Sequence, residues 1–360
     1  MRKLLLPLLF TLGPAAAWAQ EANSGFEVHG TLSGLAAYSQ ELARDPRDGA
    51  PITGGFRGML YPTLKLSRNW SISGSFGVYS RPYFYEEFST QGHGAKFDIL
   101  QAHLTYSRIW GNRSLVVRVG QLSTAFGSFL LRYDDSVNPL TDVPLSYGYY
   151  GKGVSLLGLA GAQVETTLAK LDMRAQFVNS SPANRRSVFD RDQYGNWAGG
   201  IGYTIAQGFR VGVSAYRGPY LYRSSDDYFP SEAKPRDLPG TAYGVDVQWG
   251  RGPWNAYGEF QRFQFAYHAI PTFKEDTAYG ELRRVLHPRW YVASRVSYLR
   301  ANVIPIFRVY ENAVGFRPNR YQLIKVGYEV EQSRAPNPSL ANTFAIQLVT
   351  VFRPISIARD

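Results

Sequence analysis

Apolar and polar residues alternate with a period of two along most of this chain. The stretch 97–121 shows the pattern most clearly, because Leu100 and Leu104 fall on one side while His103 and Thr105 fall on the other. After a tight Gly-Asn turn the same alternation resumes. Alternation on both arms of a short turn predicts an antiparallel β-hairpin, with one apolar and one polar face.

The same pattern recurs along the chain and predicts sixteen strands, although fourteen or eighteen would also fit the sequence. The predicted strands are residues 26–39, 56–67, 70–80, 97–110, 113–121, 162–168, 171–179, 196–205, 209–217, 242–249, 254–264, 277–286, 290–300, 306–316, 320–331 and 341–352. Seven short turns, the last at residues 317–319, alternate with eight long loops. This arrangement fits an even-numbered barrel whose two ends lie on the short-turn side.

Alternation alone does not separate a membrane barrel from a soluble β-sandwich, which also has one wet face. Many of the predicted strands are longer than the usual five or six residues and suit a tilted crossing of the hydrocarbon layer. Backbone groups in lipid must pair within the protein, and among sheets only a closed one achieves this. We therefore predict an all-β fold, a transmembrane antiparallel β-barrel, as a single domain over residues 20–360.

The first nineteen residues have the three parts of a secretory signal peptide. Arg2 and Lys3 form a basic start, residues 4–12 form a short apolar core, and Ala17 and Ala19 form a cleavage site. We expect removal of residues 1–19, export, and insertion into the outer membrane of a Gram-negative cell.

Five tryptophans lie beside the predicted short turns, where a barrel meets the membrane surface. They are Trp70, Trp110, Trp249, Trp254 and Trp290. Indole rings favour the membrane–water interface, so we interpret them as an aromatic girdle. Core residues of a soluble sheet are the alternative, and these would cluster less at one strand end.

A barrel of sixteen strands is too wide for side chains to fill, which predicts an aqueous lumen. The polar strand faces carry charges of both signs that would line it: Arg57, Lys65, Arg118, Arg174, Arg210, Asp246, Glu259, Glu281, Arg295 and Lys325. These charges could tune which ions pass, or could only hydrate and brace the wall. The net charge of +11 is spread along the chain, so we expect no nucleic-acid partner.

The long segment 123–158 is too apolar for a freely solvated loop. We predict that it folds into the lumen and forms a constriction, with Arg132, Asp134, Asp135 and Asp142 as candidate constriction residues. The alternative is an outer cap or an oligomer contact.

Residues 120–127 read Gly-Gln-Leu-Ser-Thr-Ala-Phe-Gly and follow a predicted strand. This segment resembles the G-Q-[FL]-x-x-P-F-G motif of bacterial outer-membrane porins of the phosphate-selective (porin O/P) type, with Ala125 in place of the proline. The resemblance in architecture extends over the whole mature chain. It implies a porin barrel that transports solutes passively.

The sequence offers little for catalysis. The five histidines have no metal-ligand spacing, and no nucleophile elbow or phosphate-binding glycine loop occurs. We expect no enzymatic activity, metal or cofactor. The expected function is passive diffusion of small hydrophilic solutes or ions, with a weak preference for anions. The alternative is a non-conducting surface receptor, adhesin or scaffold. Outer-membrane lipid is the expected surrounding, and a homotrimer is an open alternative to a monomer.

Overall fold

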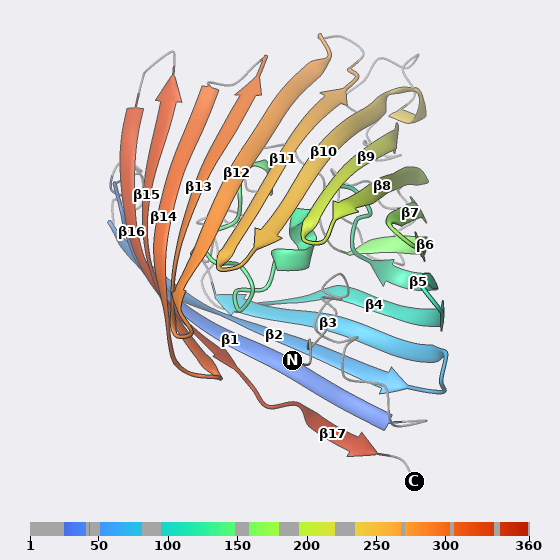
Figure 1. Cartoon of the computed structure of the whole chain (residues 1–360). Coiled ribbons are helices and arrows are strands. Elements are labelled where there is room, and N and C mark those ends of the chain that lie inside the picture. Colours follow the sequence, from blue (N-terminus) through green and yellow to red (C-terminus); the bar gives the residue numbers. More distant parts are fainter. Residues whose placement is uncertain are drawn as a thin grey trace.

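The chain forms one closed antiparallel β-barrel in a computed structural model (Figure 1). The structure describes residues 25–40, 43, 51–80, 95–147, 158–179, 194–219, 235–267, 271–302, 306–334 and 339–358. The wall strands are β1 Gly25–Ser39, β2 Ile52–Lys65, β3 Trp70–Ser80, β4 Ala95–Trp110, β5 Arg113–Leu122, β6 Leu159–Leu168, β7 Leu171–Val178, β8 Asn196–Ala206, β9 Phe209–Pro219, β10 Pro239–Arg251, β11 Trp254–Phe265, β12 Phe273–His287, β13 Trp290–Ala301, β14 Ile306–Asn319, β15 Gln322–Arg334 and β16 Ser339–Val351. The predicted signal peptide lies outside the described residues.

The barrel closes where β1 pairs with β2 on one side and with β16 on the other. Gly34, for example, lies opposite Phe56 of β2 and Leu348 of β16. Each strand from β2 to β15 pairs with the strand before it and the strand after it in the chain. Closure leaves no free sheet edge within the wall, as a strand protein in lipid requires.

The two faces of the wall differ as the alternation predicts. Large apolar side chains such as Leu60, Val213 and Ile346 are exposed on the outer face. Charged side chains such as Arg295 and Lys325 are buried on the inner face. The outer face is therefore suited to acyl chains and the inner face to a polar interior, which makes this a transmembrane barrel.

The five predicted girdle tryptophans lie at strand ends next to the short turns. Trp70, Trp110, Trp249 and Trp290 are exposed on the outer face, and Trp254 is half-buried beneath the guanidinium of Arg284. This placement is consistent with the predicted girdle, whose role at a membrane surface remains a prediction.

Several details of the prediction were wrong. β2 begins four residues earlier than expected, and β14 runs through the predicted turn at 317–319, so that the turn falls at residues 320–321. Leu100, expected on the lipid side, is buried in the lumen, because an irregularity in the β3–β4 pairing shifts its register. A short additional strand, β17 Ile355–Ala358, pairs with the start of β1 beyond the end of β16 (Figure 1).

The short turns have conformations that suit their residues. Gly111, Gly208 and Gly252 lie at positive φ, where glycine has no steric penalty. Ala169 adopts φ 57° in the β6–β7 turn without being glycine. Among the described residues, helical structure is limited to short pieces, and none of these helices has the length and apolar character needed to cross a bilayer.

Candidate constriction in the barrel lumen

After β5 the chain turns into the barrel. We call its described part, residues 123–147, the inward loop (green in Figure 1). It contains two short 3₁₀ segments, η2 Phe129–Arg132 and η3 Leu145–Tyr147. The predicted folding of this segment into the lumen is confirmed. Gly127 makes the entry possible, because it lies at φ +77° and a Cβ there would approach the Tyr147 hydroxyl to 2.2 Å.

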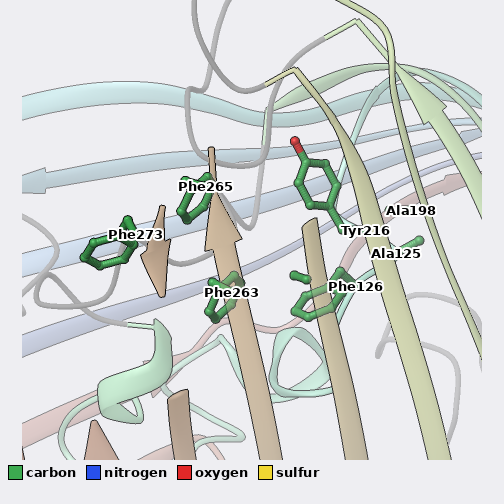
Figure 2. Close-up of a cluster of buried hydrophobic side chains, with 8 residues drawn as sticks. Ala125, Phe126, Ala198, Tyr216, Phe263, Phe265 and Phe273 are labelled. Atoms are coloured by element: carbon green, nitrogen blue, oxygen red, sulfur yellow. The ribbon is translucent and has the colours of Figure 1, made fainter. Parts of the chain in front are cut away.

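Apolar side chains attach the inward loop to the wall at several points. Figure 2 shows one of them, where Ala125 and Phe126 pack against Tyr216 of β9 and Phe263 of β11. Further along, Phe129 packs with Tyr279 of β12. Leu140 packs in a separate apolar cluster with the wall residues Tyr291, Ala293, Ala313, Leu323 and Val349. Leu145 packs in another, with Leu299 and Val309. Burial of this apolar surface explains why the segment is not a solvated loop.

The start of the loop is fixed by hydrogen bonds to strands β7 and β9. The Ala125 amide donates to Oε1 of Gln176 at 3.0 Å, and Nε2 of Gln176 donates to the Ser123 carbonyl at 2.6 Å. The Gly127 amide donates to Ser214, and Arg174 donates to the Gly127 carbonyl at 2.5 Å. These bonds satisfy backbone groups that would otherwise be buried without partners.

Glu259 of β11 joins the two ends of the inward loop. Its carboxylate accepts from the Ser128 amide at 3.0 Å and from the Tyr147 hydroxyl at 2.7 Å. Gln261 also donates to the Tyr147 hydroxyl. Burial and the neighbouring Glu259 charge raise the pKa of Tyr147 well above its ordinary value, so this phenol stays a donor at all physiological pH.

Arg132 lies in an aromatic and acidic pocket of the wall. It forms an ion pair with Glu281 of β12 and donates to the Tyr279 hydroxyl at 3.1 Å. Its guanidinium also stacks 3.8 Å from the ring centroid of Tyr257. These contacts hold the predicted constriction residue against the wall and leave it almost fully buried.

Asp134 and Asp135 tie the loop to β1 and β2. The Asp134 carboxylate accepts from the hydroxyls of Tyr61 at 2.5 Å and Thr31 at 2.9 Å. Asp135 lies 3.5 Å from the Arg57 guanidinium. Burial by itself would raise the pKa of Asp134. The hydrogen bonds from Ser136 and Tyr61 outweigh this effect, so the pKa of Asp134 is lowered.

Asp142 is buried next to the β13 wall. Its main-chain carbonyl accepts from Arg295 at 2.7 Å, and its carboxylate accepts from the Val143 amide at 2.6 Å. Burial raises the pKa of Asp142 well above 3.8, and the nearby charges of Glu329 and Glu311 add to the shift.

Further along β13 and β15, side chains hold the main chain of the loop. Lys325 donates to the Leu140 carbonyl at 3.0 Å, and Tyr291 donates to the Pro139 carbonyl at 3.0 Å. Arg295 also bridges Glu281 and Glu311, with its closest ion-pair contact at 2.5 Å. This part of the wall is a buried ionic network covered by the inward loop.

The wall from β3 to β9 has a different character. Arg118 and Glu165 pair at 2.6 Å, and their side chains keep 21% and 30% of their surface exposed. Arg210 binds Asp172 and Asp246 at 2.6 and 2.7 Å, with Asp172 40% exposed. By contrast, the Arg295 side chain has no exposed surface. The β3–β9 side therefore offers accessible charges on the inner face.

All ten predicted lumen residues lie on the inner face. Nine of them contact the inward loop or other side chains of the inner face. Lys65 shares the inward parity of Met59 and Tyr61 on β2. The alternation could not identify the uncharged residues that hold the loop, which are Tyr61, Tyr147, Gln176, Gln261, Tyr279 and Tyr291. Among the described residues, no group of three His, Asp or Glu side chains is placed to hold a metal ion.

Solved structures with the same fold are numerous, although no family model and no curated protein matches the sequence. An anion-selective porin from Comamonas acidovorans superposes with a TM-score of 0.64 at 8% identity, over 91% of this chain and 100% of that chain. The outer-membrane channel DcaP of Acinetobacter baumannii has a TM-score of 0.61 at 12% identity, over 92% and 99%. The trimer form of OmpT, an outer membrane protein of Vibrio cholerae, has a TM-score of 0.55 at 11% identity, over 91% and 99%. At such identities the likeness concerns the fold.

Proposed function

We propose that this protein is an outer-membrane porin through which small hydrophilic solutes or ions diffuse passively, and that it has no enzymatic activity. The observation that carries the proposal is the contrast within the lumen. A loop covers one part of the inner wall, while Arg118, Glu165 and Asp172 on the other part keep accessible surface. Two structural neighbours, one an anion-selective porin and the other an outer-membrane channel, support it.

In this proposal the inward loop is the constriction, and solutes pass between the loop and the wall of β3 to β7. Ser71, Ser73 and His103 lie on the inner parity of that wall and are half-buried, as expected of side chains beside a water-filled path. Arg132, Asp134, Asp135 and Asp142 would then act as supports that set the loop position. Their charges are largely used in contacts with the wall.

A weak preference for anions belongs to the proposal. Lys65, Arg118 and Arg174 place positive charge on the wall of β2, β5 and β7, and cations beside the path would favour anions. The reversal potential across a potassium chloride gradient tests this preference, and a cation-selective channel would contradict it.

Conductance of the purified, refolded protein in a planar bilayer tests the function itself. We expect discrete openings, and deletion of residues 128–146 should raise the single-channel conductance severalfold, because the covered part of the lumen would become wet. The deletion variant must still show the barrel's heat-dependent gel mobility. A folded deletion variant with unchanged conductance would contradict the constriction.

A second candidate is a non-conducting barrel that serves as a receptor, adhesin or scaffold. The breadth of the loop's attachment favours it, since hydrogen bonds reach β1, β7, β11 and β15 across the lumen. Absence of conductance in the wild type, with conductance in the deletion variant, would support this candidate. For assembly we propose a homotrimer, as for the trimer form of OmpT, and sedimentation in detergent tests it.

A further inference from the structure

Charged side chains on the outer face are unevenly distributed at the long-loop end of the barrel. In the described long-loop halves of β1 to β8, and of β10 and β16, no outward-facing residue is charged. On β9 and β11 to β15 the same depth carries six basic residues and one acidic residue: Arg217, Arg262, Lys274, Asp276, Arg300, Arg308 and Arg334. We call the residues of β11 to β14 in this set the basic arc.

The register brings the basic arc together. Asp276 lies directly opposite Arg262 of β11 on one side and Arg300 of β13 on the other. Arg308 lies opposite Tyr298, two residues along β13 from Arg300. Directly opposed residues are about 5 Å apart and diagonal ones about 7–8 Å, so the cations of neighbouring strands lie within reach of one anionic group.

Most of this charge is not neutralised by any residue that the structure describes. Asp276 is engaged by Arg262 in a two-bond ion pair with distances of 2.6 and 2.9 Å. Lys274, Arg300 and Arg308 form no ion pair with any residue that the structure describes. Tyr298 and Tyr310, toward the membrane interior, share the outward parity of these cations. Tyrosine rings next to cations are typical of the headgroup level of a bilayer.

We propose that the basic arc binds the phosphate groups of anionic lipids at the long-loop surface of the membrane. Three cations without an ion-pair partner among the described residues lie at headgroup depth and complement phosphate in charge, and guanidinium groups can contact two phosphate oxygens at once. The long-loop halves of β1 to β8, whose described outward-facing residues carry no charge, would have no such preference. The inference rests on the barrel standing in a membrane and is independent of whether its lumen conducts.

The test uses the full mature chain in nanodiscs of phosphatidylcholine containing a small fraction of phosphatidic acid with the same acyl chains. Lipid that co-purifies after detergent exchange is quantified by native mass spectrometry. We expect selective retention of phosphatidic acid, reduced about 10- to 30-fold in the Arg300→Gln/Arg308→Gln variant. The Arg300→Lys/Arg308→Lys variant should retain most of it, which also guards against an effect of misfolding.

The matched control removes two exposed arginines from the other end of the barrel, as Arg251→Gln/Arg320→Gln. Equal losses in the control and the test variant would overturn the proposal, because general charge would then explain retention. Equal retention of phosphatidylcholine and phosphatidic acid by the wild type would overturn it too. A change of oligomeric state in the test variant with unchanged lipid retention would instead assign the basic arc to a contact between copies. Conductance measured in parallel separates any failure here from a failure of the porin proposal.

Discussion

The two parts of the lumen wall use the same kinds of residue for different purposes. On β12 to β15, Arg295 and Lys325 are buried beneath the inward loop and hold its main chain, and Glu311 pairs with Arg295. On β5 to β9, ion pairs such as Arg118–Glu165 stay accessible along the inner wall. An inward charge in this barrel is therefore a structural element where the loop covers it, and a candidate determinant of permeation where the loop does not.

The largest effect should follow from breaking the covered network. Arg295→Gln leaves Glu281 and Glu311 buried without their shared counter-charge, which typically costs about 3–5 kcal/mol of unfolding free energy. Urea unfolding in lipid vesicles, followed by tryptophan fluorescence, measures the loss. A loss below about 1 kcal/mol, the range of exposed ion pairs, would mean that the covered part of the wall is hydrated.

A smaller effect is expected from Asp142→Asn within the same covered part. The raised pKa of Asp142 means that the folded protein holds a proton that the unfolded chain releases above about pH 3.8. The Asp142 contribution to stability is therefore present at low pH and is lost as pH rises through the folded-state pKa. Asparagine removes the charge and can still accept from the Val143 amide.

We expect Asp142→Asn to raise the unfolding free energy at neutral pH by on the order of 1 kcal/mol and to flatten its decline with pH. Unfolding curves at pH 5 and pH 8 provide the measurement. Asp134→Asn is the contrasting variant, because the lowered pKa of Asp134 gives stability that is lost toward low pH. The same pH dependence in both variants would contradict the assigned environments.

The barrel itself could be predicted from sequence because lipid outside and water inside impose a strict two-residue period. The period assigns Arg57, Glu281 and Arg295 to the inner face, where the structure has them buried. The predicted strand ends differ from the observed ones by a few residues where polar loops continue the pattern. Leu100 was misplaced because a local irregularity in pairing shifts parity without a sequence signal.

The candidate site was harder to predict. The apolar composition of the loop was enough to predict that it folds into the lumen. The partners of Arg132 and Asp142, however, lie more than a hundred residues away along the chain. Such pairings depend on how the closed wall surrounds the loop. Tyrosine and glutamine partners such as Tyr147 and Gln176 carry no charge, so inward-facing charge in the sequence does not reveal them.

The smallest effect on stability, and the most direct test of the comparison, concerns Arg118→Gln. Its partner Glu165 is partly exposed, so the loss of unfolding free energy should stay below about 1 kcal/mol. If solutes pass along this wall, removing the positive charge shifts the reversal potential toward cations, and Glu165→Gln shifts it toward anions. Both variants keep the same strand pairing, so each serves as the control for the other. A shift in neither variant would mean that the permeation path, if one exists, does not follow β5 and β6.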